Sequence, residues 1–128
     1  MRALLLLLVA CSSTPTPEDP VWNKQPCDHC KMIVSDKRYA ASLLDDRGQR
    51  RYFDDVGCLA EFDQAGRPAR ARWVRDEASG KWISAEAAHY RKGAATPMDF
   101  GYSAHAEPPG ISYGALKEAL AARRGALQ

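Results

Sequence analysis

The sequence has no apolar run long enough to cross a bilayer, and it carries no strong charge of either sign. Its longest apolar run, residues 3–10, would reach only about 12 Å as a helix, whereas the hydrocarbon layer is about 30 Å thick. The 18 basic and 16 acidic residues leave a formal net charge of +2. Four arginines cluster at residues 67–75, which we interpret as a solvated strand face, with a small docking patch as the alternative. These shortages argue against a transmembrane span and a nucleic-acid-binding surface.

Cysteine and histidine are also scarce, with four Cys and three His. A structural zinc site takes four ligands, usually two CxxC pairs or one such pair with two spaced histidines. Cys27 and Cys30 form a single CxxC pair, Cys58 stands alone, and His89 and His105 lie far apart in sequence. The spacing therefore disfavours structural zinc, which we keep as an alternative.

The N-terminal segment is typical of a secretory signal. Arg2 is basic, residues 3–10 are apolar, and a small residue precedes Cys11. The run Leu8–Cys11 resembles the lipobox of bacterial lipoproteins, in which the cysteine is acylated and becomes the mature N-terminus. By the same resemblance, Ser12 favours sorting to the outer membrane. An ordinary signal peptide or a buried N-terminal strand is the alternative.

We therefore expect three parts along the chain. Residues 1–10 are expected to be the signal peptide, and residues 11–20 the lipidated cysteine with a flexible tether rich in Ser, Thr and Pro. Residues 21–128 are expected to form the folded domain. With 45% hydrophobic and 27% charged residues, the composition is that of an ordinary globular protein.

Three extended segments alternate with turn and cap signals in the first half of the domain. Strands are expected at residues 39–44, 50–53 and 72–75. Gly48 is expected in the left-handed conformation of a turn between the first two strands. Asp54 or Asp55 is expected to cap a helix that ends near Gln64. The order is therefore strand, strand, helix, strand.

The second half looks like a looser copy of this order. Extended segments are expected at residues 82–90 and 99–106. A final helix is expected to begin at a Ser112 cap and to place Tyr113, Leu116 and Leu120 on one face. The sequence thus predicts an α+β fold of two small similar ββαβ units packed together, at about residues 33–76 and 81–125.

The segment CDHCKM, residues 27–32, gathers two thiols, an imidazole and a thioether. In an extended segment the side chains of Cys30 and Met32 would point to one face. Soft sulfur ligands select Cu(I). A site of one thiolate with one or two thioethers gives the ion few ligands, so the ion can be transferred to another protein by ligand exchange. A dithiol redox site is the alternative, although no helix-period pattern follows the pair. The residues therefore favour a Cu(I) carrier.

Three segments resemble the NosL family of nitrous-oxide-reductase accessory lipoproteins: CDHCKMIVSDKRYAA from residue 27, YFDDVGCLAEF from residue 52 and ATPMDFGYSAH from residue 95. The resemblance covers nearly all of the mature chain. It implies a lipid-anchored Cu(I) chaperone facing the periplasm, not an enzyme, with a pair of ββαβ units similar to part of organomercurial lyase. It also implies a partner, either nitrous oxide reductase or its copper-assembly ABC transporter complex.

Position by position, the resemblance implies that Cys30, Met32 and Met98 bind Cu(I). Cys27 matches the leading cysteine and is either a further ligand or a disulfide partner of Cys30. His29 lies inside the motif and is expected to be an extra ligand or a group behind the ligands. Without the resemblance, Met98 would be read as a core residue.

The other chemically active residues have structural interpretations. Cys58 lies on the apolar face of the first helix and is interpreted as a buried structural thiol. Asp54 and Asp55 are interpreted as helix caps, with an acidic pair beside the copper site as the alternative. A competing hypothesis is an organomercurial-lyase-like enzyme, in which Cys30, Cys58 and one of these carboxylates would act together, although fold analogy alone is weak support.

Overall fold

The computed structural model describes residues 13–127. The predicted signal peptide and the lipobox with Cys11 lie outside these residues, so the lipid anchor stays a prediction. In the described part of the chain, no helix combines the length and the apolar character that a membrane crossing requires.

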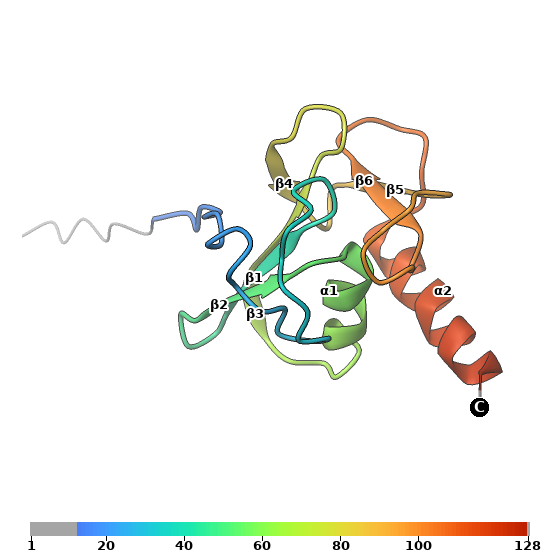
Figure 1. Ribbon diagram of the computed structural model, residues 1–128, viewed down its shortest axis with the longest axis horizontal. Coiled ribbons are helices and arrows are strands. Elements are labelled where there is room, and N and C mark those ends of the chain that lie inside the picture. The colour runs from blue at the N-terminus through green and yellow to red at the C-terminus, as the bar shows by residue number, and fades with distance from the viewer. Residues whose placement is uncertain (1–12, 128) are drawn as a thin grey trace, which may run out of the picture.

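The chain forms an α+β fold with two antiparallel sheets and two helices, as the sequence predicts (Figure 1). The strands are β1 Ala41–Asp45, β2 Arg50–Phe53, β3 Ala69–Arg75, β4 Trp82–Ser84, β5 His89–Lys92 and β6 Tyr102–His105, and the helices are α1 Val56–Asp63 and α2 Tyr113–Ala126. The first sheet has the order β2-β1-β3-β4, and the second pairs β5 with β6.

The β1–β2 hairpin is closed by a turn that its own residues stabilise. Asp45 Oδ1 accepts hydrogen bonds from the backbone N–H of Arg47 at 2.9 Å and of Gln49 at 2.8 Å. Gly48 has φ +82°, a left-handed conformation that glycine adopts without steric cost. The expected turn is confirmed, and it places Leu43 directly opposite Arg51 in the hairpin.

Helix α1 follows β2 after two aspartates, and the second of them is the cap. Asp55 accepts a hydrogen bond from the N–H of Gly57 at 2.9 Å, which satisfies one of the free donors of the first turn. The helix has eight residues and buries Val56, Cys58 and Leu59. Because Asp55 caps the helix, the carboxylate of Asp54 is left for another role.

The second half of the chain does not repeat the first. A tight turn closes between Asp76 and Lys81, with the N–H of Asp76 donating to the carbonyl of Lys81 at 2.8 Å. This turn folds β4 back onto β3, so β4 completes the first sheet. The remaining elements are the β5–β6 hairpin and α2, which Ser112 caps as predicted. The prediction of two similar ββαβ units is therefore not confirmed.

One core joins both sheets and both helices. Phe53 and Leu59 from the first half and Tyr90 and Leu116 from the second are fully or almost fully buried in the same cluster. Helix α1 packs against β1, β2 and β6 as well as α2. The two halves therefore share one hydrophobic interior.

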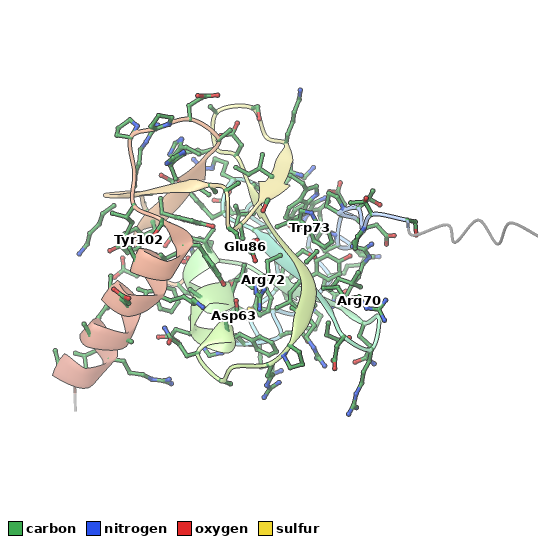
Figure 2. The ribbon with its side chains drawn as sticks, turned by 180° about the vertical axis from the view of Figure 1, so that it is seen from behind. Asp63, Arg70, Arg72, Trp73, Glu86 and Tyr102 are labelled. Atoms are coloured by element: carbon green, nitrogen blue, oxygen red, sulfur yellow. The ribbon has the colours of Figure 1, made fainter. Side chains whose placement is uncertain are left out.

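A buried ion pair connects α1, β3 and α2. Arg72 Nε donates to Asp63 Oδ2 at 2.5 Å, and the hydroxyl of Tyr113 donates to the same oxygen at 2.6 Å. Arg72 also contacts Glu86, and Figure 2 shows Asp63, Arg72 and Glu86 close together. Burial raises the pKa of Tyr113, and its bond to Asp63 raises the pKa further.

The segment before the domain lies against the first sheet. The carbonyl of Thr16 accepts a hydrogen bond from Arg50 at 2.7 Å, and Asp19 accepts one from the indole of Trp82 at 2.8 Å. Pro20 is buried. The sequence interpretation made residues 11–20 a flexible tether, whereas residues 16–20 make these contacts, because the sheet presents arginine and tryptophan donors to them.

Candidate metal centre

Residues 27–32 form a tight turn that is anchored on β2. The N–H of Cys27 donates to the carbonyl of Met32 at 2.7 Å, and the N–H of Lys31 donates to the carbonyl of Cys27 at 3.1 Å. Asp28 exchanges two hydrogen bonds with the backbone of Tyr52, both of 2.8 Å. The turn therefore holds its cysteines against the end of β2, where α1 begins.

Four side chains from three parts of the chain converge there, and we call them the thiol cluster: Cys27, Cys30, Asp54 and Cys58. Their sulfur atoms and one carboxylate oxygen all lie within 4.8 Å of one another. The turn supplies the CxxC pair, the link from β2 to α1 supplies Asp54, and the first turn of α1 supplies Cys58. Such a group is able to hold a metal ion.

Asp54 is the common acceptor of the cluster. The thiol of Cys30 donates to Asp54 Oδ1 at 3.2 Å, and the thiol of Cys58 donates to the same oxygen at 3.5 Å. Cys27 and Cys58 are fully buried and Asp54 is 2% exposed, while Cys30 is only partly buried. Cys30 is therefore the member of the cluster that solvent or a partner reaches first.

Hydrogen bonds within the cluster and burial shift the pKa values of the three thiols in different directions. A hydrogen bond from Cys58 lowers the pKa of Cys27 to about 6, against the opposing effect of burial. The same interaction raises the pKa of Cys58, and burial raises the pKa of Cys30 to about 12. The hydrogen bonds and burial thus favour the thiolate form at Cys27 over that at Cys30 or Cys58, and all three cysteines are free of disulfides.

The two methionines of the predicted ligand set lie in different settings. Met32 is 58% exposed. The backbone N–H of Met98 donates to Asp55 Oδ2 at 3.0 Å, and its side chain is half-buried against the core. This bond brings the Met98 loop to the start of α1, next to Asp54. The participation of either thioether in metal binding stays a prediction.

The expectation that Cys30 and Met32 share one face of an extended segment does not fit the turn. Lys31, between them, has φ +70°, a left-handed conformation that ends any simple alternation of side chains. The backbone reverses at this residue, so Met32 points into solvent while Cys30 joins the cluster. The left-handed conformation is expected from sequence mainly at glycine, so a lysine at this position does not reveal the turn.

His29 has a protein partner of its own. Its Nε2 lies 2.8 Å from Glu61 Oε2 on α1, and the group of atoms within 4.8 Å of one another does not include it. This contact holds the turn to helix α1, in addition to the anchor on β2. Its role as an extra ligand stays a prediction.

Cys58 and Asp54 join the cluster, where the sequence analysis placed them only in its alternative hypotheses. Cys58 is buried, as interpreted, but its sulfur faces the CxxC pair; Asp54 was interpreted as a cap, whereas Asp55 caps the helix. Asp54 precedes the cap residue and lies outside the helix, so helical spacing gives no signal for its contact with Cys58.

Comparison of the chain with family models, with curated proteins and with solved structures gives no match.

Proposed function

We propose that the chain is a copper chaperone that carries Cu(I) as cargo in the thiol cluster. The observation that carries this proposal is the convergence of three cysteine sulfurs within 4.8 Å of one another and of one carboxylate oxygen. Thiolates are soft ligands that select monovalent copper, whereas oxygen ligands suit magnesium or calcium. Asp54 accepts hydrogen bonds from the thiols of Cys30 and Cys58. As an oxygen group, it suits this role better than that of a Cu(I) ligand.

The unequal burial of the cysteines favours transfer over permanent storage. Cys27 and Cys58 are enclosed, while Cys30 is partly accessible and Met32 stands in solvent two residues further along. An incoming thiolate from a partner has a path to an ion at Cys30 without unfolding the site. The ion then moves by successive exchange of sulfur ligands.

The finer parts of the proposal come from the sequence motifs. They are a ligand set of Cys30, Met32 and Met98, with Cys27 as a further ligand, and a lipid anchor at Cys11 on the periplasmic face, in the outer membrane. The proposed recipient is nitrous oxide reductase or its copper-assembly ABC transporter complex. The Met98 loop lies beside the first turn of α1, which is consistent with this ligand set.

A competition titration with a chromophoric Cu(I) chelator tests the proposal. Cys30→Ser is expected to weaken Cu(I) binding by at least about a hundredfold, since a thiolate is lost, and Met98→Leu by about tenfold. Ser103→Ala, remote from the cluster in sequence and on β6, is the control. If Cys30→Ser binds Cu(I) with the same affinity as the parent, the proposed site is refuted. X-ray absorption of the copper-loaded protein would count the sulfur neighbours of the ion.

One observation favours a second candidate, cleavage of a carbon–mercury bond. Cys30 and Cys58 both donate to the same oxygen of Asp54, so two sulfurs and a proton carrier meet at one point. In such a reaction the two sulfurs bind mercury, one thiol proton is released to solvent, and the other passes through Asp54 to the leaving carbon, which keeps the electron pair of the broken carbon–mercury bond. Methane release from methylmercury that is lost in Asp54→Asn would establish this candidate, and its absence supports the chaperone.

A further inference from the structure

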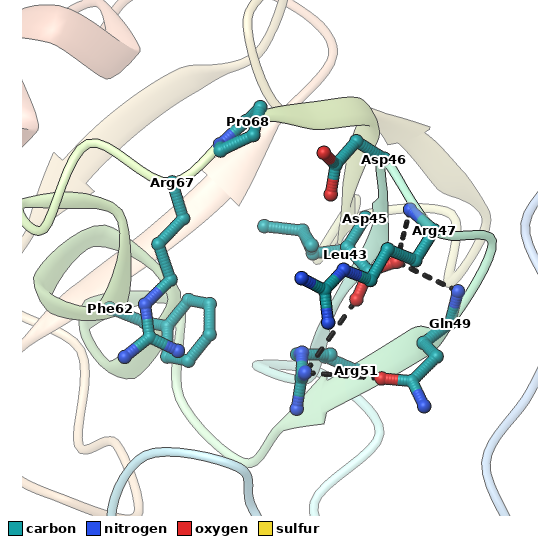
Figure 3. Close-up of a pocket in the computed structure, with 9 residues that line it drawn as sticks. All are labelled: Leu43, Asp45, Asp46, Arg47, Gln49, Arg51, Phe62, Arg67 and Pro68. Carbon is teal, nitrogen blue, oxygen red and sulfur yellow. Dashed lines mark hydrogen bonds and ion pairs between the residues drawn. The ribbon is translucent and has the colours of Figure 1, made fainter.

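A cavity of about 370 Å³ lies at the turn end of the β1–β2 hairpin, and none of its lining residues belongs to the thiol cluster (Figure 3). Helix α1 ends at Asp63, and its Phe62 lines the cavity together with Arg67 and Pro68 from the loop that follows. We call this cavity the arginine pocket, after three of its lining residues: Arg47 in the turn, Arg51 on β2 and Arg67 in the loop after α1.

The floor of the arginine pocket is apolar. Leu43, Phe62 and Pro68 line it, and the guanidinium of Arg67 stacks on the ring of Phe62 with its carbon 4.6 Å from the ring centre. Arg51 approaches the same ring at 5.8 Å. Stacking fixes the plane of a guanidinium and leaves its N–H edge free to donate hydrogen bonds.

The positive charge of the pocket is only partly compensated. Within residues 13–127, no carboxylate lies within ion-pair distance of the guanidinium of Arg47 or Arg67. Asp45 is already used, because it accepts two backbone N–H bonds in the turn and lies 3.6 Å from Arg51. Asp46 also lines the pocket and is the remaining negative charge there.

We propose that the arginine pocket binds a small molecule that carries a carboxylate or phosphate group on a flat apolar body. The oxyanion would accept hydrogen bonds from Arg47 and Arg67, in the forked geometry that guanidinium offers to such groups. The apolar body would lie on the ring of Phe62. A cavity of this volume accommodates one ring with its head group. The proposal is independent of the metal and of the function of the thiol cluster.

Titration of ¹⁵N-labelled protein with phenyl phosphate, followed by NMR, tests the proposal. Saturable shifts are expected at the amides of Arg47, Gln49, Phe62 and Arg67. Inorganic phosphate and phenol, each half of the probe, are expected to bind at least about tenfold more weakly, because each satisfies only one part of the pocket. Phosphate or phenol that binds as tightly as the probe would overturn the proposed ligand class.

Matched variants separate this pocket from general attraction of anions. Arg47→Gln/Arg67→Gln is expected to lose phenyl phosphate binding by about a hundredfold, while Lys92→Gln/Arg124→Gln, with the same charge change on exposed residues elsewhere, leaves it unchanged. Asp46→Asn is expected to tighten binding, since a like charge is removed. Equal affinity in the two double variants, or no saturable shift in the parent, would overturn the site.

Discussion

Asp55 performs two tasks at once, and its replacement gives a sharp test of how the Met98 loop is held. Its carboxylate caps α1 through Gly57 at 2.9 Å and accepts the backbone N–H of Met98 at 3.0 Å, in a fully buried position. Loss of a helix cap costs about 1 kcal/mol. A buried N–H left without a partner costs about 1–3 kcal/mol. Asp55→Ala is therefore expected to lower the free energy of unfolding by about 2–4 kcal/mol.

Urea unfolding followed by circular dichroism measures this change, and the second helix supplies the control. Ser112 caps α2 through one bond, from the N–H of Ala115 at 3.1 Å, and Ser112→Ala is expected to cost about 1 kcal/mol. Asp55→Asn keeps an oxygen acceptor and removes a buried charge, so it is expected to cost less than Asp55→Ala. If Asp55→Ala costs no more than Ser112→Ala, the bond to Met98 contributes nothing and the reasoning is refuted.

Three further predictions concern the core, the effect of pH and metal binding. Tyr113→Phe removes a donor from Asp63 and is expected to lower the free energy of unfolding by about 1–3 kcal/mol, measured in urea; no loss would contradict the role of this bond. A hydrogen bond from Ser79 lowers the pKa of Asp76, so the ionised carboxylate stabilises the fold above its unfolded pKa of about 3.9, and this contribution is lost as the pH falls. In Asp76→Asn the free energy of unfolding, measured in urea, should therefore depend less on pH below about 4 than in the parent. Free Cu(I) at about 100 times its Kd should add about 2.7 kcal/mol, and an unshifted melting temperature would contradict binding to the folded state.

The elements that local chemistry determines were predictable from sequence. Gly48 and Ser112 mark a turn and a cap, and the structure confirms both positions; for the first helix the sequence left Asp54 and Asp55 open, and Asp55 is the cap. The partner of β4 was not predictable in this way. A short strand after a tight turn can pair with its neighbour or start a new unit, and here the pairing with β3 is formed.

The candidate site was predictable only in part, because its members meet through tertiary contacts. The CxxC pair is visible in the sequence, and the apolar helical face correctly indicates that Cys58 is buried. Burial alone does not say which side chain lies next to a thiol. That depends on Asp28, which anchors the turn to Tyr52 and so sets Cys30 opposite Asp54.

Arg51 stands on the boundary between the two sites. Its guanidinium lies 3.4 Å from Asp28, which fixes the cysteine turn, and 3.6 Å from Asp45, which fixes the hairpin turn beside the arginine pocket. One side chain is thus ion-paired with a carboxylate at each of the two turns. A molecule in the pocket that draws Arg51 away would leave Asp28 with its hydrogen bonds to the backbone of Tyr52 alone, so occupation of the pocket would act on the cysteine turn through a single residue.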